Sequence, residues 1–168
     1  MVYLVTSYPA SSFREHVFQA DAFLHGHTYL WTAQVAEANV INNRAYIVHP
    51  PLADVVMVPS VLVQGVNQAS QQIISILIGA VCALLVFRLT ANLWLTAFFA
   101  FGTIVWYESI LGAQWGFCLV LSCVPTLCAL IGIKEHWNPL YIGAMAGLAF
   151  LARYDLALAL PIYLCMVD

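Results

Sequence analysis

The side chains best suited to metal chemistry lie within the first 54 residues of the chain. They are four histidines and two acids, namely His16, His25, His27, His49, Glu15 and Asp21. Imidazole and carboxylate groups gathered on one face can bind a divalent cation. His25 and His27 also stand at a predicted helix end, where the helix dipole favours a positive charge without any metal. A divalent-cation site and interfacial histidines without a ligand are therefore the two explanations for this segment.

The two acids of this segment, Glu15 and Asp21, do not form a paired-carboxylate site by themselves. A helix is predicted from about Ser12 to His25, because Ser12 and Glu15 have capping-box spacing and apolar residues follow at helical intervals. On this helix Asp21 shares one stripe with Arg14 and His25, whereas Glu15 lies on another, about a third of a turn away. Glu15 can act in the capping box, and Asp21 can pair with Arg14 or His25.

One basic residue in the second half of the chain breaks the charge pattern. Basic residues in short loops favour the cytoplasmic side of a membrane, so Arg88 and Lys134, two apolar runs apart, define an inner side. Arg153 then lies on the outer side, with Glu108 and the polar N-terminal segment. Two explanations are open for Arg153: an ion pair with Asp155 at an interfacial turn, or a site for an anion.

The composition of the chain predicts an integral membrane protein, because 63% of its residues are hydrophobic and only 8% are charged. Long apolar runs end at charged residues, as a bilayer requires. Several runs are shorter than the ~20 residues that cross a ~30 Å hydrocarbon core, so the helices must include flanking residues. Five spans are predicted, the last incomplete, around residues 73–87, 93–107, 117–133, 140–152 and 156–167.

The predicted fold class is all-α, a polytopic transmembrane helical bundle over residues 69–168 that follows a non-cytoplasmic segment of residues 1–68. In that first segment, short apolar stretches at residues 40–41 and 45–48 flank Asn42, Asn43 and Arg44, residues that tolerate positive φ, which predicts a small hairpin. After Pro50 and Pro51, the apolar stretch that contains Asp54 is too short to span, so we expect a short helix at the outer interface.

Other features limit the partners of the chain. Its five basic residues are scattered and do not form a nucleic-acid footprint, which excludes nucleic acid. The cysteines lie inside apolar runs without C-x-x-C spacing, so they are interpreted as small buried hydrophobic residues. Gly143 and Gly147 have small-xxx-small spacing and predict close helix packing, for which a neighbour in the same chain is preferred to a partner subunit.

The order of these segments resembles a known family. The segments are "FREHVFQADAFLHGHTYL", "NNRAYIVHPPLADVVMVPSVL", "QQIISILIGAVCALLVFRLT", "WLTAFFAFGTIVWYESILGAQWGFCLVL" and "LYIGAMAGLAFLARYDLALALPIYL". Together they resemble the integral membrane glycosyltransferases of the GT-C superfold, in particular the bacterial, family 39-like relatives of protein O-mannosyltransferases and aminoarabinose transferases. The resemblance covers nearly the whole chain, as an N-terminal fragment of such an enzyme. Its most specific part is the hairpin and Pro-Pro-Leu together with Gly-Leu-Ala-Phe-Leu-Ala-Arg.

The resemblance implies a multi-pass enzyme of the bacterial cytoplasmic membrane. It implies transfer of a sugar from a polyprenyl phosphate carrier to a lipid, glycan or protein acceptor on the non-cytoplasmic face. Arg153 matches a basic residue near the lipid phosphate in the family, and His49 matches a position where relatives often carry lysine. Arg153 and His49 are therefore predicted to bind substrate, and His16 is a third candidate. No cofactor is expected beyond a divalent cation.

Such a transfer also needs a carboxylate that accepts the proton of the acceptor hydroxyl. In the register of the resemblance, the position of the family's acid holds Ser12, and the nearest carboxylates are Glu15 and Asp21. These two are the predicted catalytic residues. The alternative function is a non-catalytic membrane protein of the same fold that binds lipid or acts as a scaffold.

Overall fold

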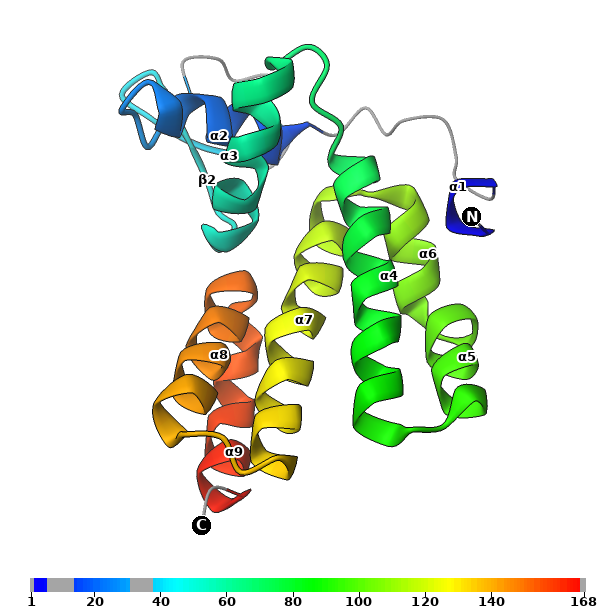
Figure 1. The fold of residues 1–168 in the computed structure, drawn as a ribbon. Helices are drawn as coiled ribbons and strands as arrows, with labels where there is room; N and C mark the ends of the chain where they lie inside the picture. The colour runs from blue at the N-terminus through cyan, green and yellow to red at the C-terminus, as the bar shows by residue number, and fades with distance from the viewer. Residues whose placement is uncertain (1, 6–13, 31–37, 167–168) are drawn as a thin grey trace.

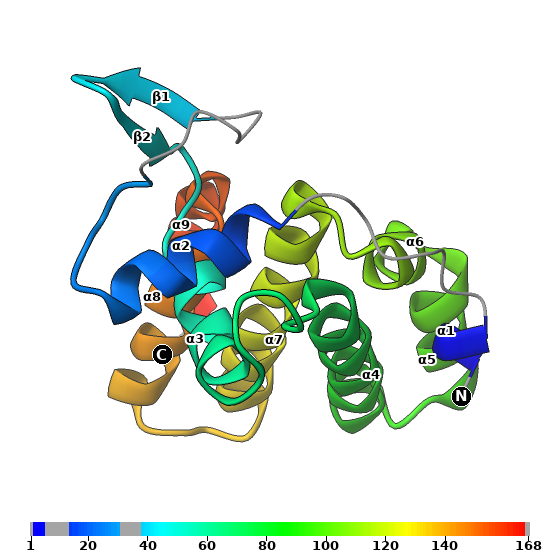
Figure 2. The same ribbon diagram turned by 90° about the horizontal axis from the view of Figure 1, so that it is seen from above.

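The computed structural model describes residues 2–5, 14–30 and 38–166, and this part of the chain is mostly helical (Figure 1). Residues 14–30 and 38–64 form what we call the cap, and residues 71–166 form the body. The cap lies over one end of the body, above α7 and α8 in Figure 1. In Figure 2, α2 lies across α3, and the hairpin extends away from the helices. A short helix, α1 (Val2–Val5), contacts α6.

The cap contains two helices and one hairpin. Its elements are α2 (Glu15–Leu24), β1 (Ala38–Ile41), β2 (Arg44–Ile47) and α3 (Leu52–Gln64). The predicted hairpin is confirmed: Ile41 pairs with Arg44, and the two turn residues Asn42 and Asn43 have φ of 51° and 61°. Positive φ at both turn residues is typical of a type I′ turn, whose twist matches that of the strands. The predicted short helix is also confirmed as α3, with 13 residues.

The first cap helix begins later than predicted. Helix α2 starts at Glu15, and Arg14 stands at its N-cap without a side-chain cap hydrogen bond. Ser12, the predicted capping residue, lies outside the described residues. The guanidinium of Arg14 instead donates a hydrogen bond to the carbonyl of Val66, in the linker that follows α3. Arg14 thereby ties the start of α2 to the segment that enters the body.

The body contains two helices that are long and apolar enough to cross a membrane, or three if the bent pair α5 and α6 is counted as one span. Of the five predicted spans, the fourth forms a 14-residue helix and the fifth divides into a 3₁₀ helix and a short α-helix. The elements are α4 (Gln71–Thr90), α5 (Leu93–Gly102), α6 (Ile104–Leu111), α7 (Gln114–Lys134), α8 (Pro139–Ala152), η1 (Tyr154–Ala159) and α9 (Leu160–Met166).

The second predicted span is bent by 52° at Thr103. Thr103 is extended, with φ of −115° and ψ of 170°, so the helical backbone is interrupted there. Its hydroxyl donates to the carbonyl of Phe99, 2.7 Å away, and accepts from the backbone N–H of Val105 at 3.3 Å. One threonine therefore satisfies backbone groups on both sides of the bend, at the end of α5 and at the start of α6.

The predicted arrangement of basic residues about the body agrees with the structure. Arg88 makes two hydrogen bonds to the carboxylate of Glu135, at 3.1 and 2.8 Å, and Lys134 donates to the carbonyl of Leu89 at 2.6 Å. Arg88 and Lys134 therefore lie at the same end of the body. The end of α8, where Arg153 follows, lies at the other end, below the cap in Figure 1.

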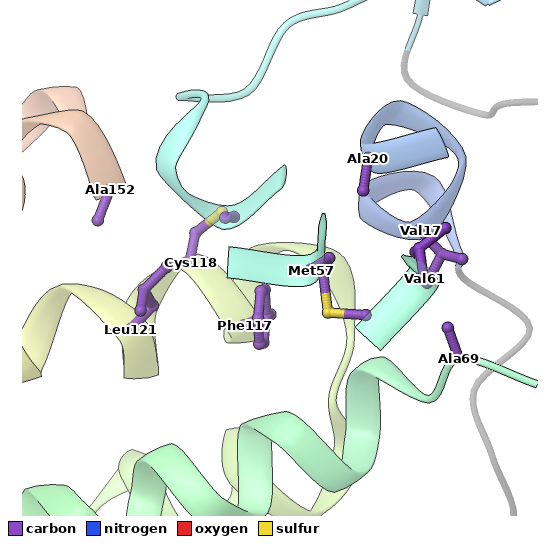
Figure 3. Packing of buried hydrophobic residues seen from close by; sticks show 10 residues of the cluster. Val17, Ala20, Met57, Val61, Ala69, Phe117, Cys118, Leu121 and Ala152 are labelled. Atoms are coloured by element: carbon purple, nitrogen blue, oxygen red, sulfur yellow. The ribbon is translucent and has the colours of Figure 1, made fainter. Parts of the chain in front are cut away.

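Cap and body share one apolar core (Figure 3). It brings together apolar side chains from α2, α3, the linker, α7 and α8. Its buried members are Val17, Ala20, Ala53, Met57, Val61, Ala69, Phe117, Cys118, Leu121 and Ala152. Met57 and Phe117 are fully buried at the centre of this contact, so the cap is packed on the body rather than tethered to it.

The predicted packing role of Gly143 and Gly147 within the chain is wrong. A Cβ atom added at either glycine would meet nothing within 4 Å in the described structure. Helix α8 packs against α7 through a different face, which carries Ile142, Ala146 and Ala149. The backbone of α8 therefore makes no close approach to another helix at these glycines.

The backbone of Gln72, on α4, lies very close to Gly112. Gly112 has φ of +59°, and a Cβ atom there would lie 2.5 Å from the Cα of Gln72. Gly112→Ala should lower the free energy of unfolding by about 2 kcal/mol or more, because it adds left-handed strain and a backbone clash. Gly143→Ala, which meets open space, is the matched control. Unfolding of both variants in detergent measures the effect, and equal stability of the two would contradict this packing.

Candidate functional site

A buried ion pair joins the two cap helices beside the body. His16 on α2 has no exposed surface, and Asp54 on α3 is 3% exposed. The imidazole Nδ1 of His16 lies 2.6 Å from Oδ1 of Asp54. The second ring nitrogen, Nε2, lies 3.3 Å from the backbone oxygen of Gln114, at the start of α7, and 3.6 Å from Sγ of Cys118. His16 thus connects three helices, because it belongs to α2 and its ring contacts α3 and α7.

These contacts favour a doubly protonated ring on His16. A carbonyl oxygen can only accept, so the contact with Gln114 requires a proton on Nε2, while Nδ1 donates to the carboxylate of Asp54. Burial by itself lowers the pKa of His16, but hydrogen bonds to Asp54 and Cys118 and the charge of Asp54 outweigh it and raise the pKa to about 10. Burial also raises the pKa of Asp54, against the opposing effect of His16. The pair therefore holds its proton tightly and carries no net charge.

Next to this pair, a pocket of about 280 Å³ lies between cap and body. Its volume is near the lower end of the range for small-molecule sites. The lining comes from the segment after β2, the start of α7, the end of α8 and η1. It consists of Val48, His49, Pro50, Trp115, Cys118, Ala152, Arg153, Tyr154 and Asp155. His49 and Arg153, the two residues predicted to contact a phosphate, thus lie in one pocket although they are far apart in the sequence.

Arg153 is held within the pocket by Asp155. The Nε of Arg153 donates to Oδ1 of Asp155 at 2.9 Å, and Nη2 donates to Oδ2 at 2.6 Å. The guanidinium side chain is 30% exposed, and the Asp155 side chain is 57% exposed. The ion pair proposed for Arg153 from the sequence is therefore present, and it lies on the wall of a pocket that a ligand can enter.

His49 is buried between cap and body. Its ring stands edge-on to Trp115, with ring centroids 4.6 Å apart. The side-chain amide nitrogen of Gln114 is hydrogen-bonded to Nε2 of His49. Since an amide nitrogen only donates, Nε2 of His49 accepts, and the imidazole is neutral with its proton on Nδ1. Pro50 and Pro51 fix the chain direction directly after His49, which limits how far this ring can move.

The predicted catalytic carboxylates lie outside this pocket. Glu15 is buried at the first turn of α2. Asp21 lines a second hollow of about 340 Å³ with His25 and His27. There Nδ1 of His25 lies 3.6 Å from Oδ1 of Asp21, which agrees with one of the two pairings expected for Asp21. The carboxylate in the lining of the His49–Arg153 pocket is Asp155.

The four histidines of the metal hypothesis fall in two separate places. His16 and His49 lie beside the first pocket, with ring centroids 5.7 Å apart, whereas His25 and His27 line the second hollow. Among the residues that the structure describes, no group of three or more histidine, cysteine or acidic side chains is arranged to hold a metal ion. His16, which was also predicted to bind substrate, is fully buried and does not line the pocket.

Sequence reasoning missed Asp54, Gln114 and Trp115 as site residues. Asp54 carried a usable signal, since it is an acid within an apolar stretch too short to span, and a buried acid needs a partner. The sequence gives no signal for Gln114 and Trp115, because their role depends on the tertiary contact between the start of α7 and the segment after β2.

Comparisons of this chain with protein-family models, with curated proteins and with solved structures find no match. Its function is therefore inferred from its own residues and geometry.

The ion pair predicts how stability depends on pH. The pKa of His16 is raised from 6.5 to about 10 by folding, so its stabilisation is complete below pH 6.5 and is lost as the pH rises towards about 10. The upward shift of Asp54 acts in the same direction. The free energy of unfolding, measured by denaturation in detergent between pH 6 and 10, should therefore fall with rising pH.

Asp54→Asn should reverse this slope near neutral pH. Without the carboxylate, burial holds the pKa of His16 below its unfolded value, and stability then rises with pH up to about 6.5. The variant should also lose about 3 kcal/mol at neutral pH, as expected when one partner of a buried pair is removed. His25→Gln, which removes the exposed partner of Asp21, is the control and should keep the wild-type slope. An unchanged slope in Asp54→Asn would show that the pair does not hold the proton.

Proposed function

We propose that this protein is a multi-pass membrane glycosyltransferase that binds a polyprenyl-phosphate-linked sugar at the His49–Arg153 pocket. The observation that carries the proposal is that a buried imidazole and a guanidinium share one pocket at the junction of cap and body. This junction lies at the end of the body opposite to Arg88 and Lys134, which would face the cytoplasm. The pocket would then open on the non-cytoplasmic face.

The groups in the pocket suit the phosphate of a lipid carrier. A guanidinium offers planar N–H donors that match phosphate oxygens, and charge-assisted bonds of this kind are strong. The His49 ring lies in the same lining, edge-on to Trp115. Trp115 is 61% exposed and Tyr154 is 50% exposed. Tryptophan and tyrosine side chains are common at membrane interfaces, where they lie at the level of the lipid headgroups.

Asp155 would control how strongly this site binds an anion. It neutralises Arg153 through two hydrogen bonds. An incoming phosphate competes with the Asp155 carboxylate for the same donors, so binding requires that Asp155 shift or share them. A carboxylate released from Arg153 can accept a proton from the acceptor hydroxyl, so Asp155 is the candidate base in this pocket.

The second candidate function is a membrane protein that binds a lipid phosphate without transferring a sugar. The observation that favours it is the separation of Glu15 and Asp21 from the His49–Arg153 pocket. Phosphate binding and sugar transfer can be measured separately, which distinguishes the two functions.

Arg153→Ala should weaken binding of a short-chain polyprenyl phosphate about tenfold to a hundredfold, because charge-assisted hydrogen bonds to the phosphate are lost. Arg88→Ala is the matched control: Arg88 makes the same double hydrogen bond to a carboxylate, Glu135, at the opposite end of the body. Binding is measured by titration calorimetry in detergent. Equal affinities of the two variants would refute the phosphate site.

Single replacements of the three carboxylates separate transfer from binding. Asp155→Asn should bind the phosphate severalfold more tightly, since Arg153 loses its competing partner. If Asp155 is also the base, the same variant loses sugar transfer, measured with a radiolabelled lipid-linked sugar. Asp21→Asn and Glu15→Gln should leave phosphate affinity unchanged. Wild-type binding without transfer in any acceptor assay would favour the second candidate function.

A further inference from the structure

We propose that His16 and Asp54 are positioning residues that fix the proton on Nδ1 of His49, acting through Gln114. Neither His16 nor Asp54 lines the pocket. Their effect reaches His49 through hydrogen bonds on the two sides of one buried residue: His16 contacts the backbone oxygen of Gln114, and the side-chain amide of Gln114 contacts His49. The consequence for phosphate binding rests on the proposed function, whereas the protonation of His49 does not.

The first step connects the ion pair to the start of α7. Asp54 holds Nδ1 of His16 at 2.6 Å, which turns Nε2 towards the backbone oxygen of Gln114 at 3.3 Å. The N-cap residue of α7, Ala113, offers no side-chain hydrogen bond to the first turn. His16 holds this turn from outside, through the backbone oxygen of Gln114.

The second step connects Gln114 to His49. The side chain of Gln114 is buried, at 4% exposed for the residue, so its amide cannot turn freely. Its nitrogen donates to Nε2 of His49. A free imidazole distributes its proton over both nitrogens, and this donor allows only the form protonated on Nδ1. The buried partner thus sets the tautomer, in the way that outer partners orient histidines that bind metals.

The third step concerns orientation. The His49 ring packs edge-on against Trp115, the neighbour of Gln114 on the first turn of α7. One helical turn therefore supplies both the hydrogen-bond donor and the aromatic surface that hold His49. Because His16 fixes this turn by its carbonyl, a change in the ion pair moves both supports of His49 at once.

The test reads the tautomer directly from the ¹⁵N chemical shifts of His49 in histidine-labelled protein in detergent micelles. The wild-type protein should show a protonated Nδ1 and an unprotonated Nε2. Gln114→Leu and Asp54→Asn should both give a mixture of tautomers, and Gln114→Glu should move the proton to Nε2, because a carboxylate accepts. Gln114→Glu keeps the side-chain length and carries the test if Gln114→Leu does not fold.

Tyr3→Phe is the matched control, since it removes one buried hydrogen bond, from the hydroxyl of Tyr3 to the carbonyl of Ala100 on α5, and neither residue lines the pocket. It should leave the His49 signals unchanged. A wild-type pattern at His49 in Asp54→Asn, or in Gln114→Glu, would overturn the proposal.

A second readout links the positioning to binding. Affinity for a short-chain polyprenyl phosphate should fall severalfold in Asp54→Asn and Gln114→Leu but not in Tyr3→Phe. The wild-type protein can show the expected His49 tautomer, and the variants can lose it, while the wild-type protein binds no polyprenyl phosphate. In that case the proposed function fails and the positioning role stands.

Discussion

The arrangement of the whole molecule depends on one buried ion pair, between His16 and Asp54. A charged imidazole and a carboxylate inside an apolar core are tolerated only when each satisfies the other, and this pair also reaches the start of α7. The apolar contacts around Met57 and Phe117 hold cap and body together. The directional bonds of His16 add specificity of orientation, because they are satisfied in a single arrangement of α2, α3 and α7.

The orientation of the cap in turn creates the pocket. His49 follows the hairpin in the cap, whereas Arg153 follows α8 in the body, so the two line one cavity only because the cap is docked in this position. The pocket combines a guanidinium paired with Asp155, a buried imidazole and the aromatic rings of Trp115 and Tyr154. We interpret this set as a phosphate site for a lipid carrier, with Asp155 as both competitor for Arg153 and candidate base.

Local patterns in the sequence predicted the local structure well. Asn42 and Asn43 predicted the hairpin because positive φ at two successive positions demands such residues, and the short apolar stretch around Asp54 predicted α3. The bend at Thr103 was missed, since a threonine that bonds both sides of a break is not distinguishable in sequence from one inside a helix. The partner of Asp54 was missed because His16 meets it only through tertiary packing.

The orientation of the body was predicted better than its number of membrane spans. Charges at run ends placed Arg88 and Lys134 together, which the contacts at that end of the body reproduce. The spans were overcounted, because apolar composition does not reveal that α8 has only 14 residues or that η1 interrupts the last run.

The most direct test of the account is photo-crosslinking with a polyprenyl phosphate that carries its reactive group next to the phosphate, followed by peptide mapping. The account predicts labelling of the peptides that contain His49, Trp115 and Tyr154, with loss of label when excess unlabelled polyprenyl phosphate is present. Labelling confined to the exposed apolar faces of α4 and α5, and insensitive to that competitor, would contradict it.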